Sequence, residues 1–211
     1  MNDEQETIAM TPEQRAFTFL KRLCIDCRKC PIGGKTVVNT EAGSGNISNV
    51  FSNMNGTAQI MVVGQNPGMD EVYQGTPFVG DSGKVFDAAL QDVLGIHRSS
   101  LYITNVVKCY TPKNRKPTQP ELDACRSFLD REVEMVKPKV IIALGGFAFK
   151  QLTGMSGIMK HCGETVFSPR YGVNVLALLH PSPFNTNHPE RRMMFFSGLE
   201  KLREYLDTEG V

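Results

Sequence analysis

The stretch Ile60-Met-Val-Val-Gly-Gln-Asn-Pro-Gly68, followed by Gly75-Thr-Pro-Phe-Val-Gly-Asp-Ser-Gly83, decides how the rest of the chain is interpreted. Its first four residues are apolar and rich in β-branched side chains, which is typical of a buried strand in a parallel sheet. The glycines and prolines that follow are too dense for a regular element, so we predict a shaped loop at the carboxyl end of this strand. Open α/β sheets bind ligands at that end. Unless the loop is only a turn with incidental polar residues, its polar side chains are candidates for chemistry: Gln65, Asn66, Asp70 and Glu71.

Length and composition fit one domain spanning residues 1–211. The chain is 41% hydrophobic and has a formal net charge of +1, so it can bury one good core, and any binding of nucleic acid must rest on local patches. The first residues are polar and acidic, and we expect residues 1–10 to form a disordered tail. No apolar run reaches 18 residues, which predicts a cytoplasmic protein without a membrane segment.

Strands and helices alternate along the sequence. After the first strand, further strands are predicted at Leu101 to Val107, Val140 to Leu144 and Val173 to Leu179. Helices are predicted after Thr11, at Lys84 to Leu94, Pro120 to Val136, Phe147 to Leu152 and Glu190 to Tyr205. Between Pro31 and Gly56 we expect an irregular connection with a short strand at Thr36 to Val38. This order predicts a doubly wound α/β domain, a three-layer αβα sandwich around a mostly parallel four-stranded sheet.

The loops after the first, second and fourth strands of such a sheet open at the same edge. Asn66, Asn105 and His180 are therefore expected to meet in one pocket. Each has a simpler interpretation as well. Asn105 at a strand end can serve to satisfy backbone groups, and His180, which precedes Pro-Ser-Pro, can be a turn residue.

Six cysteines in a chain expected to be intracellular favour metal or cofactor binding over disulfides. Three lie close together and the others are distant: Cys24, Cys27 and Cys30, then Cys109, Cys125 and Cys162. Four converging thiolates can hold zinc or an iron-sulfur cluster, and the spacing alone does not choose between them. The alternative is a set of buried free thiols.

Several motifs, in their order along the chain, resemble those of the uracil-DNA glycosylase superfamily. They are Gly64-Gln-Asn-Pro-Gly68, Gly75-Thr-Pro-Phe-Val-Gly80, Thr104-Asn-Val-Val-Lys-Cys109, Pro138 with Leu144-Gly145, and His180-Pro-Ser-Pro183. The cysteine pattern is similar to that of the family-4 enzymes, which carry a 4Fe-4S cluster. The resemblance implies four ligands and leaves Cys24 spare: Cys27, Cys30, Cys109 and Cys125. Such a cluster would be structural and would pin the loop from Tyr110 to Thr118.

The same resemblance implies a monofunctional DNA glycosylase of base excision repair, a hydrolase that flips a pyrimidine nucleotide, breaks its N-glycosyl bond and leaves an abasic site. Gln65 and Asn66 would then face the glycosidic bond and Phe78 would stack on the flipped base. Asn105 would read the Watson-Crick edge and His180 would lie against O2. Gly68 belongs to the same base-binding group, since it leaves room at C5 where the best-known uracil enzymes have a tyrosine.

The predicted partner is DNA, held by local groups in three places. The loop before the Pro120 helix carries basic side chains that can meet phosphates or form a solvated loop: Lys113, Arg115 and Lys116. The turn after the fourth strand offers a rigid, apolar wedge: Pro181, Ser182, Pro183 and Phe184. At the start of the last helix, Arg191 and Arg192 are candidates for further phosphate contacts.

Departures from the family-4 pattern leave the substrate open. Family-4 enzymes usually have glutamate at the position of Gln65, a small residue at that of Asn66 and an acidic residue at that of Val72, and Asn66 resembles the mismatch-specific and single-strand-selective branches. The covalent histidine of the uracil-trapping branch has no counterpart within residues 110–124. Uracil or a C5-modified pyrimidine fits the pattern, and so does an antiviral enzyme that excises hypermodified cytosine, for example glucosylated hydroxymethylcytosine, from phage DNA. From other classes, a non-catalytic DNA-binding relative and a metal-dependent hydrolase remain alternatives.

Overall fold

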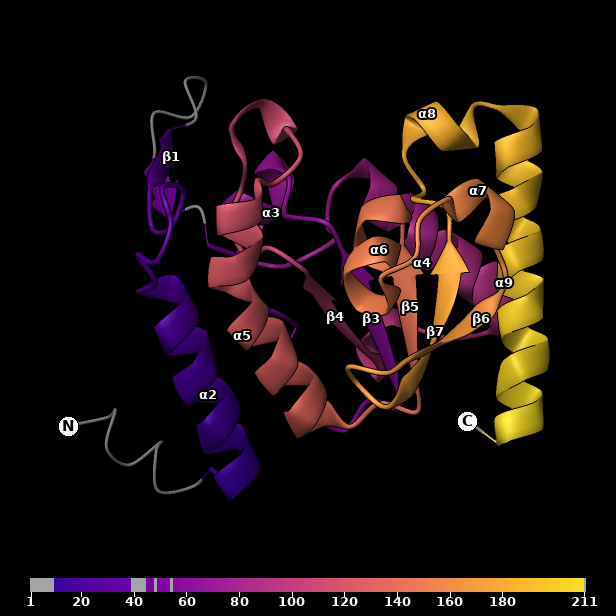
Figure 1. Cartoon of the computed structure of the whole chain (residues 1–211), viewed down its shortest axis with the longest axis horizontal. Helices are drawn as coiled ribbons and strands as arrows, with labels where there is room; N and C mark the ends of the chain where they lie inside the picture. Colours follow the sequence, from indigo (N-terminus) through magenta and orange to yellow (C-terminus); the bar gives the residue numbers. More distant parts are fainter. Residues whose placement is uncertain (1–9, 39–44, 48, 54, 211) are drawn as a thin grey trace.

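The computed structural model describes residues 10–38, 45–47, 49–53 and 55–210, and it has a central sheet with helices on both faces (Figure 1). The sheet has five strands in the order β4-β3-β5-β7-β6: Leu101–Asn105, Ile60–Gly64, Val140–Leu144, Val173–Leu178 and Thr165–Ser168. The first four are parallel and β6 is antiparallel to β7. The α/β fold is thus confirmed. The predicted tail lies outside the described residues, apart from Met10.

The predicted count of four strands is wrong, because β6 was missed. This edge strand has two exposed residues and only one buried one, so it shows no apolar run. The predicted strand at Thr36–Val38 is confirmed as β1, which pairs antiparallel with β2 (Gly45–Ile47) in a separate small sheet.

The helices agree with the expected positions, with one addition in the loop between β3 and α4 (residues 65–80), which we call the central loop. The expected ones are α2 (Pro12–Ile25), α4 (Asp81–Leu94), α5 (Gln119–Val136), α6 (Gly146–Thr153) and α9 (Pro189–Glu209). Contrary to the prediction of an irregular loop, Met69–Gln74 forms the short helix α3. Other short segments are α7 (Ile158–His161), α8 (Pro183–Thr186) and the 3-10 turns η1 (Arg98–Ser100) and η2 (Pro112–Asn114).

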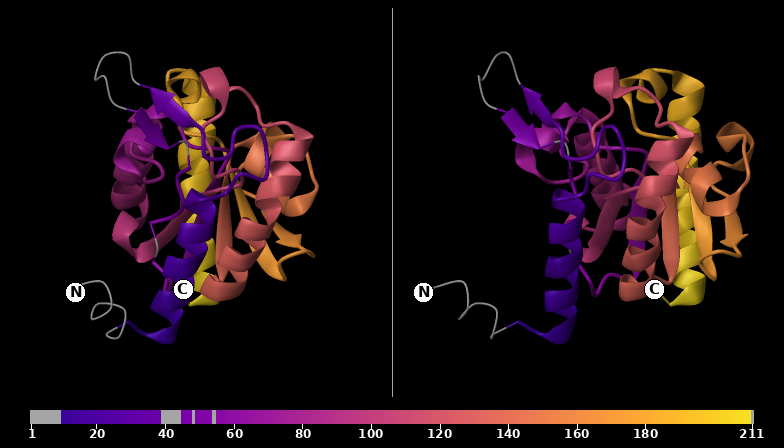
Figure 2. Two further views of the ribbon diagram at one scale, coloured as in Figure 1. Left: turned by 90° about the vertical axis from the view of Figure 1, so that its left-hand side faces the viewer. Right: turned by 60° about the vertical axis from the view of Figure 1, so that its left-hand side comes forward.

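Alternate residues of each strand face opposite helical layers. In β3, Met61 and Val63 pack in a core with α2, α5 and α6, while Ile60 and Val62 pack in a second core with α4 and α9. Figure 2 shows these two groups of helices on opposite sides of the sheet. A strand covered on both faces must be apolar throughout, which explains the continuous hydrophobic run of β3.

The parallel strands end together, and this brings their loops to one edge. Gly64 is the register partner of Asn105, and the amides of Val106 and Val107 donate to the carbonyls of Gly64 and Gln65 at 2.9 and 3.0 Å. In Figure 1 this edge is the upper one, where β7 runs toward α8 and where the chain enters α5. The central loop and the end of β4 are thereby joined by backbone hydrogen bonds.

A fully buried ion pair lies behind this edge and joins β4 to α5. The Lys108 ammonium donates to a Glu132 carboxylate oxygen, to Thr104 Oγ1 and to the carbonyl of Asn105, the last two at 2.6 Å. The other carboxylate oxygen of Glu132 accepts from Thr104 Oγ1 at 2.9 Å and from the Tyr102 hydroxyl at 3.1 Å. Each of the three N–H bonds of Lys108 therefore has an acceptor, which is what a buried charge requires.

Among the described residues, no helix combines the length and the apolar character needed to cross a membrane.

Candidate active site

A cavity of about 300 Å³ opens at the carboxyl edge of the sheet. Its walls come from the central loop, the start of α4, the ends of β4 and β7, and the loop before α5. The lining side chains that the sequence analysis singled out are Asn66, Phe78, Asn105 and His180, and Gly68 and Pro183 also border the cavity. The structure brings these residues together as predicted. Their roles remain predictions.

Asn105 presents an unused amide to this cavity. The residue is 1% exposed, and its Oδ1 and Nδ2 make no hydrogen bond to any residue that the structure describes. A Cβ on Gly64 would lie 2.5 Å from both Asn105 Oδ1 and Phe78 Cζ, so only glycine permits this close approach. A buried amide without partners costs about 1–3 kcal/mol, which fits a group kept for a ligand.

Phe78 forms a wall of the cavity and has an unusual backbone. The residue is 7% exposed and has φ of 54°, a conformation that costs an aromatic residue on the order of 1–3 kcal/mol. Its ring centroid lies 6.0 Å from that of His180, with 37° between the ring planes. The two rings thus border the same part of the cavity.

His180 follows β7 and is largely shielded from water. Burial lowers the pKa of its imidazole below the usual 6.5, and the nearby Glu71 carboxylate opposes this shift with a smaller effect. The Asn185 amide donates to the His180 carbonyl at 2.7 Å and so holds the turn that carries it. At neutral pH this imidazole is uncharged and can donate one hydrogen bond.

The Asn66 amide is oriented by two neighbouring side chains. Gln65 Nε2 donates to Asn66 Oδ1 at 2.8 Å, while Asn66 Nδ2 donates to Asn114 Oδ1 and to the Pro67 carbonyl, each at 3.0 Å. Gln65 does not line the cavity itself and borders an adjoining hollow with His180. Sequence reasoning missed Asn114, which does line the cavity. Its only sequence signal is that of a turn residue in Thr-Pro-Lys-Asn.

Glu71, a candidate for chemistry from its place in the loop, serves the loop structure. Its carboxylate accepts hydrogen bonds from the backbone amides of Gly68, Val79 and Gly80 at 2.8, 2.9 and 2.8 Å. These contacts connect the first and last turns of the loop. The carboxylate of Asp70 borders the cavity from an exposed position.

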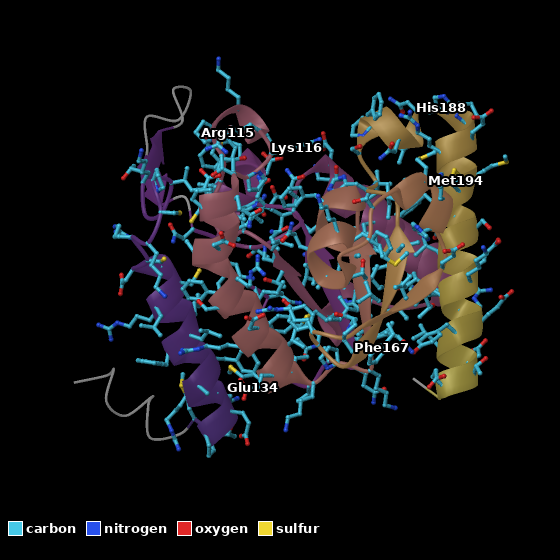
Figure 3. All side chains as sticks on the ribbon, in the orientation of Figure 1. Arg115, Lys116, Glu134, Phe167, His188 and Met194 are labelled. Carbon is cyan, nitrogen blue, oxygen red and sulfur yellow. The ribbon has the colours of Figure 1, made fainter. Side chains whose placement is uncertain are left out.

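The basic loop before α5 is partly committed to its own structure. Arg115 donates to both oxygens of Glu121, at 2.9 and 2.6 Å, and to the carbonyl of Lys116 at 3.0 Å. The hydrogen bonds from Arg115, more than any other cause, lower the pKa of Glu121 to about 2. Lys113 and Lys116 are exposed, and Figure 3 shows Arg115 and Lys116 at the edge of the molecule above α5. As it stands, Arg115 anchors the loop that presents Asn114.

The residues predicted as a wedge and as phosphate contacts lie around α8 and the start of α9, at the same carboxyl edge of the sheet. Phe184 is 74% exposed and Pro183 is exposed, whereas Pro181 is buried and Ser182 half-buried. The Arg191 guanidinium lies 4.4 Å from the centroid of the Phe184 ring, and that of Arg192 lies 5.8 Å from the Phe196 ring. In Figure 3, His188 marks this region, opposite Arg115 across the upper edge.

Four cysteines gather where α2, α5 and the end of β4 meet. Cys109 and Cys125 are buried, and Cys27 and Cys30 pack on the same core. The pKa of the Cys109 thiol is raised to about 12, mostly by burial and in smaller part by the neighbouring Cys125, Cys30 and Cys27, which places the four thiols near one another. Within the described ranges, no three His, Cys, Asp or Glu side chains are arranged as metal ligands. The donor set of four neighbouring thiols from three segments nevertheless fits a metal or iron-sulfur centre.

Of the remaining two cysteines, Cys24 is fully buried in the same core as these four. Burial strongly raises the pKa of its thiol, and the nearby Cys109 and Cys125 add to the shift with smaller effects. Cys162 packs in the other core, where its thiol lies 3.4 Å from the Met194 carbonyl.

The fold and the motifs at this edge define a known class of protein. The family model of the uracil DNA glycosylase superfamily matches residues 51–204, and the chain belongs to this superfamily. It is 35% identical over 190 residues to a type-4 uracil-DNA glycosylase of Archaeoglobus fulgidus. The aligned region covers 87% of this chain and 89% of the relative. A type-4 enzyme of Thermotoga maritima is 34% identical over 187 residues, with 87% and 91% covered. A type-5 uracil-DNA glycosylase of Pyrobaculum aerophilum is 40% identical over 113 residues, with 52% and 47% covered.

Proposed function

We propose that this chain is a monofunctional DNA glycosylase that flips uracil out of DNA and hydrolyses its N-glycosidic bond. The observation that carries the proposal is the buried amide of Asn105, which makes no hydrogen bond within the described part of the chain and lies beside an aromatic wall. Uracil presents an N3–H donor next to the O4 acceptor, and an asparagine amide offers the matching acceptor and donor. The superfamily membership and the type-4 relatives support the same reaction.

Flipping places the base where the enzyme can reach its glycosidic bond. The plane of Phe78 offers a face on which the base stacks, and Asn105 pairs with its edge. An unstacked uracil therefore gains one aromatic contact and two hydrogen bonds in the cavity. The exposed Phe184 and the adjacent Pro183 would fill the gap that the nucleotide leaves in the stack.

Bond breaking leaves negative charge on the base and positive charge on the sugar. The neutral imidazole of His180 donates a hydrogen bond to the developing anion at O2, and a shielded donor of this kind is worth more than one in water. Asn66, turned by Gln65 and Asn114, orients the attacking water. An amide cannot take the proton of that water as a carboxylate would, so stabilisation of the leaving group carries most of the rate.

The product should be an intact abasic site. Among the described residues that line the cavity none is a lysine, and Lys108 is held by Glu132 in the core. Among these lining residues there is therefore no amine to form a Schiff base with the sugar and to start the strand cleavage that follows it.

A 4Fe-4S cluster is the proposed cofactor, with Cys27, Cys30, Cys109 and Cys125 as its ligands. These four residues would hold it between the end of β4, α5 and the segment after α2, where it would supply a structural link. Both Cys109 and Cys125 flank the loop that carries Asn114, so the ligands fix the base of that loop. This role is structural, and the chemistry at the glycosidic bond belongs to the side chains of the cavity.

Excision of a modified cytosine is the second candidate. Since no hydrogen bond to a described residue fixes the amide of Asn105, the amide is free to turn and to match N3 and N4 of cytosine. An antiviral role against phage DNA with hypermodified cytosine would follow from that substrate.

The direct test is a cleavage assay on duplex and single-stranded oligonucleotides that carry one uracil, hydroxymethyluracil, hydroxymethylcytosine or glucosylated hydroxymethylcytosine. We expect alkali-labile sites with uracil, and no strand scission before alkali. The variants His180→Ala and Asn66→Ala should each slow cleavage on the order of a hundredfold to a thousandfold while DNA affinity stays the same. Cleavage of modified cytosine alone would favour the second candidate, and full activity of both variants would contradict the assigned roles.

The pH dependence of cleavage follows from the lowered pKa of His180. Because the neutral form is the donor, the rate should hold as the pH falls through 6.5 and should decline only below it. The unfolded chain binds this proton near 6.5, so the same burial also makes stability fall toward acid pH. Rates of wild type and His180→Ala, measured from about pH 5 to 8 at constant ionic strength, test this. An acid limb centred above 6.5 that disappears in the variant would contradict it.

The proposed cluster can be tested without an activity assay. Purified protein should be brown and contain about four irons and four sulfides per chain. Cys125→Ser should lose iron and colour, whereas Cys162→Ser is the matched control, since its thiol lies in the other core, and should keep both. A colourless protein with one tightly bound zinc would show that the four thiols hold a different metal.

A further inference from the structure

The backbone of Phe78 needs an external support. Its φ of 54° is one of four positive values among the described residues other than glycine, and Phe78 is the bulkiest side chain of that group. Such a conformation persists only where neighbouring groups hold it. Two groups hold it: Arg98 and the first turn of α4, where Gly83 lies.

Arg98, in η1, donates hydrogen bonds to the carbonyl of the strained residue and to the carbonyl before it. Its Nη1 donates to the Phe78 carbonyl and its Nη2 to the Pro77 carbonyl, each at 2.9 Å. Nη1 also donates to Asp87 Oδ2 at 2.6 Å. The planar guanidinium is suited to this task because its donors are fixed in a fork, which a lysine ammonium does not reproduce.

Asp87 of α4 is committed to this contact. One of its carboxylate oxygens bonds Arg98, and the other is buried and has no hydrogen-bond partner among the described residues. Leaving a carboxylate oxygen in that state is costly, so its placement indicates that orienting Arg98 matters.

The first turn of α4 closes on the same peptide from the other side. A Cβ on Gly83 would lie 2.0 Å from the Phe78 carbonyl oxygen and 2.4 Å from its carbonyl carbon. The helix backbone therefore packs directly on the strained residue. Arg98 and Gly83 together leave the Phe78 peptide little freedom to turn.

We propose that Arg98, oriented by Asp87, is a positioning residue that fixes the Phe78 ring as the stacking face for the flipped base. The inference rests on the proposed function, since it assumes that a base enters the cavity. Arg98 is not among the described residues that line the cavity, so it acts through the backbone of Phe78. Without the hydrogen bonds from Arg98, the Phe78 peptide relaxes and the ring leaves the plane on which the base stacks.

A double-mutant cycle on single-turnover cleavage of a uracil oligonucleotide tests this. Arg98→Met should slow cleavage about five- to a hundredfold, the range expected for losing one base–aromatic stack. Phe78→Ala should cause a similar loss, and adding Arg98→Met to it should cause little more, because the two changes remove the same contact. Losses that multiply, or no loss in Arg98→Met, would overturn the inference.

Two further variants separate positioning from stability. Arg170→Met removes another arginine–carboxylate pair, in which Arg170 Nη2 lies 2.6 Å from Asp130 Oδ2. This pair lies away from the cavity, so the variant should leave the cleavage rate unchanged. If Arg98→Met does not fold, Arg98→Lys replaces it in the same cycle, with a smaller loss that must again vanish without the Phe78 ring. A wild type that leaves uracil intact would refute the proposed function, whereas an active wild type matched by Arg98→Met would refute only the role of Arg98.

Discussion

The buried contact between Lys108 and Glu132 is the constraint on which the edge of the sheet depends. Lys108 holds the carbonyl of Asn105 and the hydroxyl of Thr104, while Glu132 belongs to α5. Removing one partner would leave a charge in the core, which is far more costly than replacing both with apolar groups. The pair therefore fixes where β4 stops and where its last side chain points. Cys109 follows directly in the chain, so the cysteine group and the cavity share this support.

The cavity combines several features that oppose stability. The Asn105 amide has no hydrogen-bond partner among the described residues, Phe78 has a strained backbone, and burial lowers the pKa of His180. Proteins keep such features where a ligand or a reaction needs them, and the rest of the fold compensates. Here the compensation is visible in two sets of hydrogen bonds: those from Arg98 to the carbonyls of the Phe78 turn and those from the amides of the same loop to Glu71.

Much of this arrangement could be predicted from the sequence because parallel strands buried on both faces are continuous apolar runs. Their shared carboxyl edge brought the loops of Asn66, Asn105 and His180 together. The edge strand β6 lacks such a run and was missed. Asn114 was missed because its contact with Asn66 depends on two consecutive left-handed residues and on an ion pair that anchors the loop. A carboxylate that holds backbone amides, as Glu71 does, looks like a catalytic one until the direction of those amides is known.

The central claim is that the amide of Asn105 is kept unsatisfied in order to read the base. Replacing it with leucine, which has a similar shape and no polar side-chain atoms, separates the effect of the amide on stability from its effect on cleavage. Asn105→Leu should raise the free energy of unfolding by about 1–3 kcal/mol, because a buried unpaired amide is removed. It should also lower single-turnover cleavage of uracil at least about a thousandfold, because the hydrogen bonds to the base are lost. A less stable variant that still cleaves uracil would contradict the account.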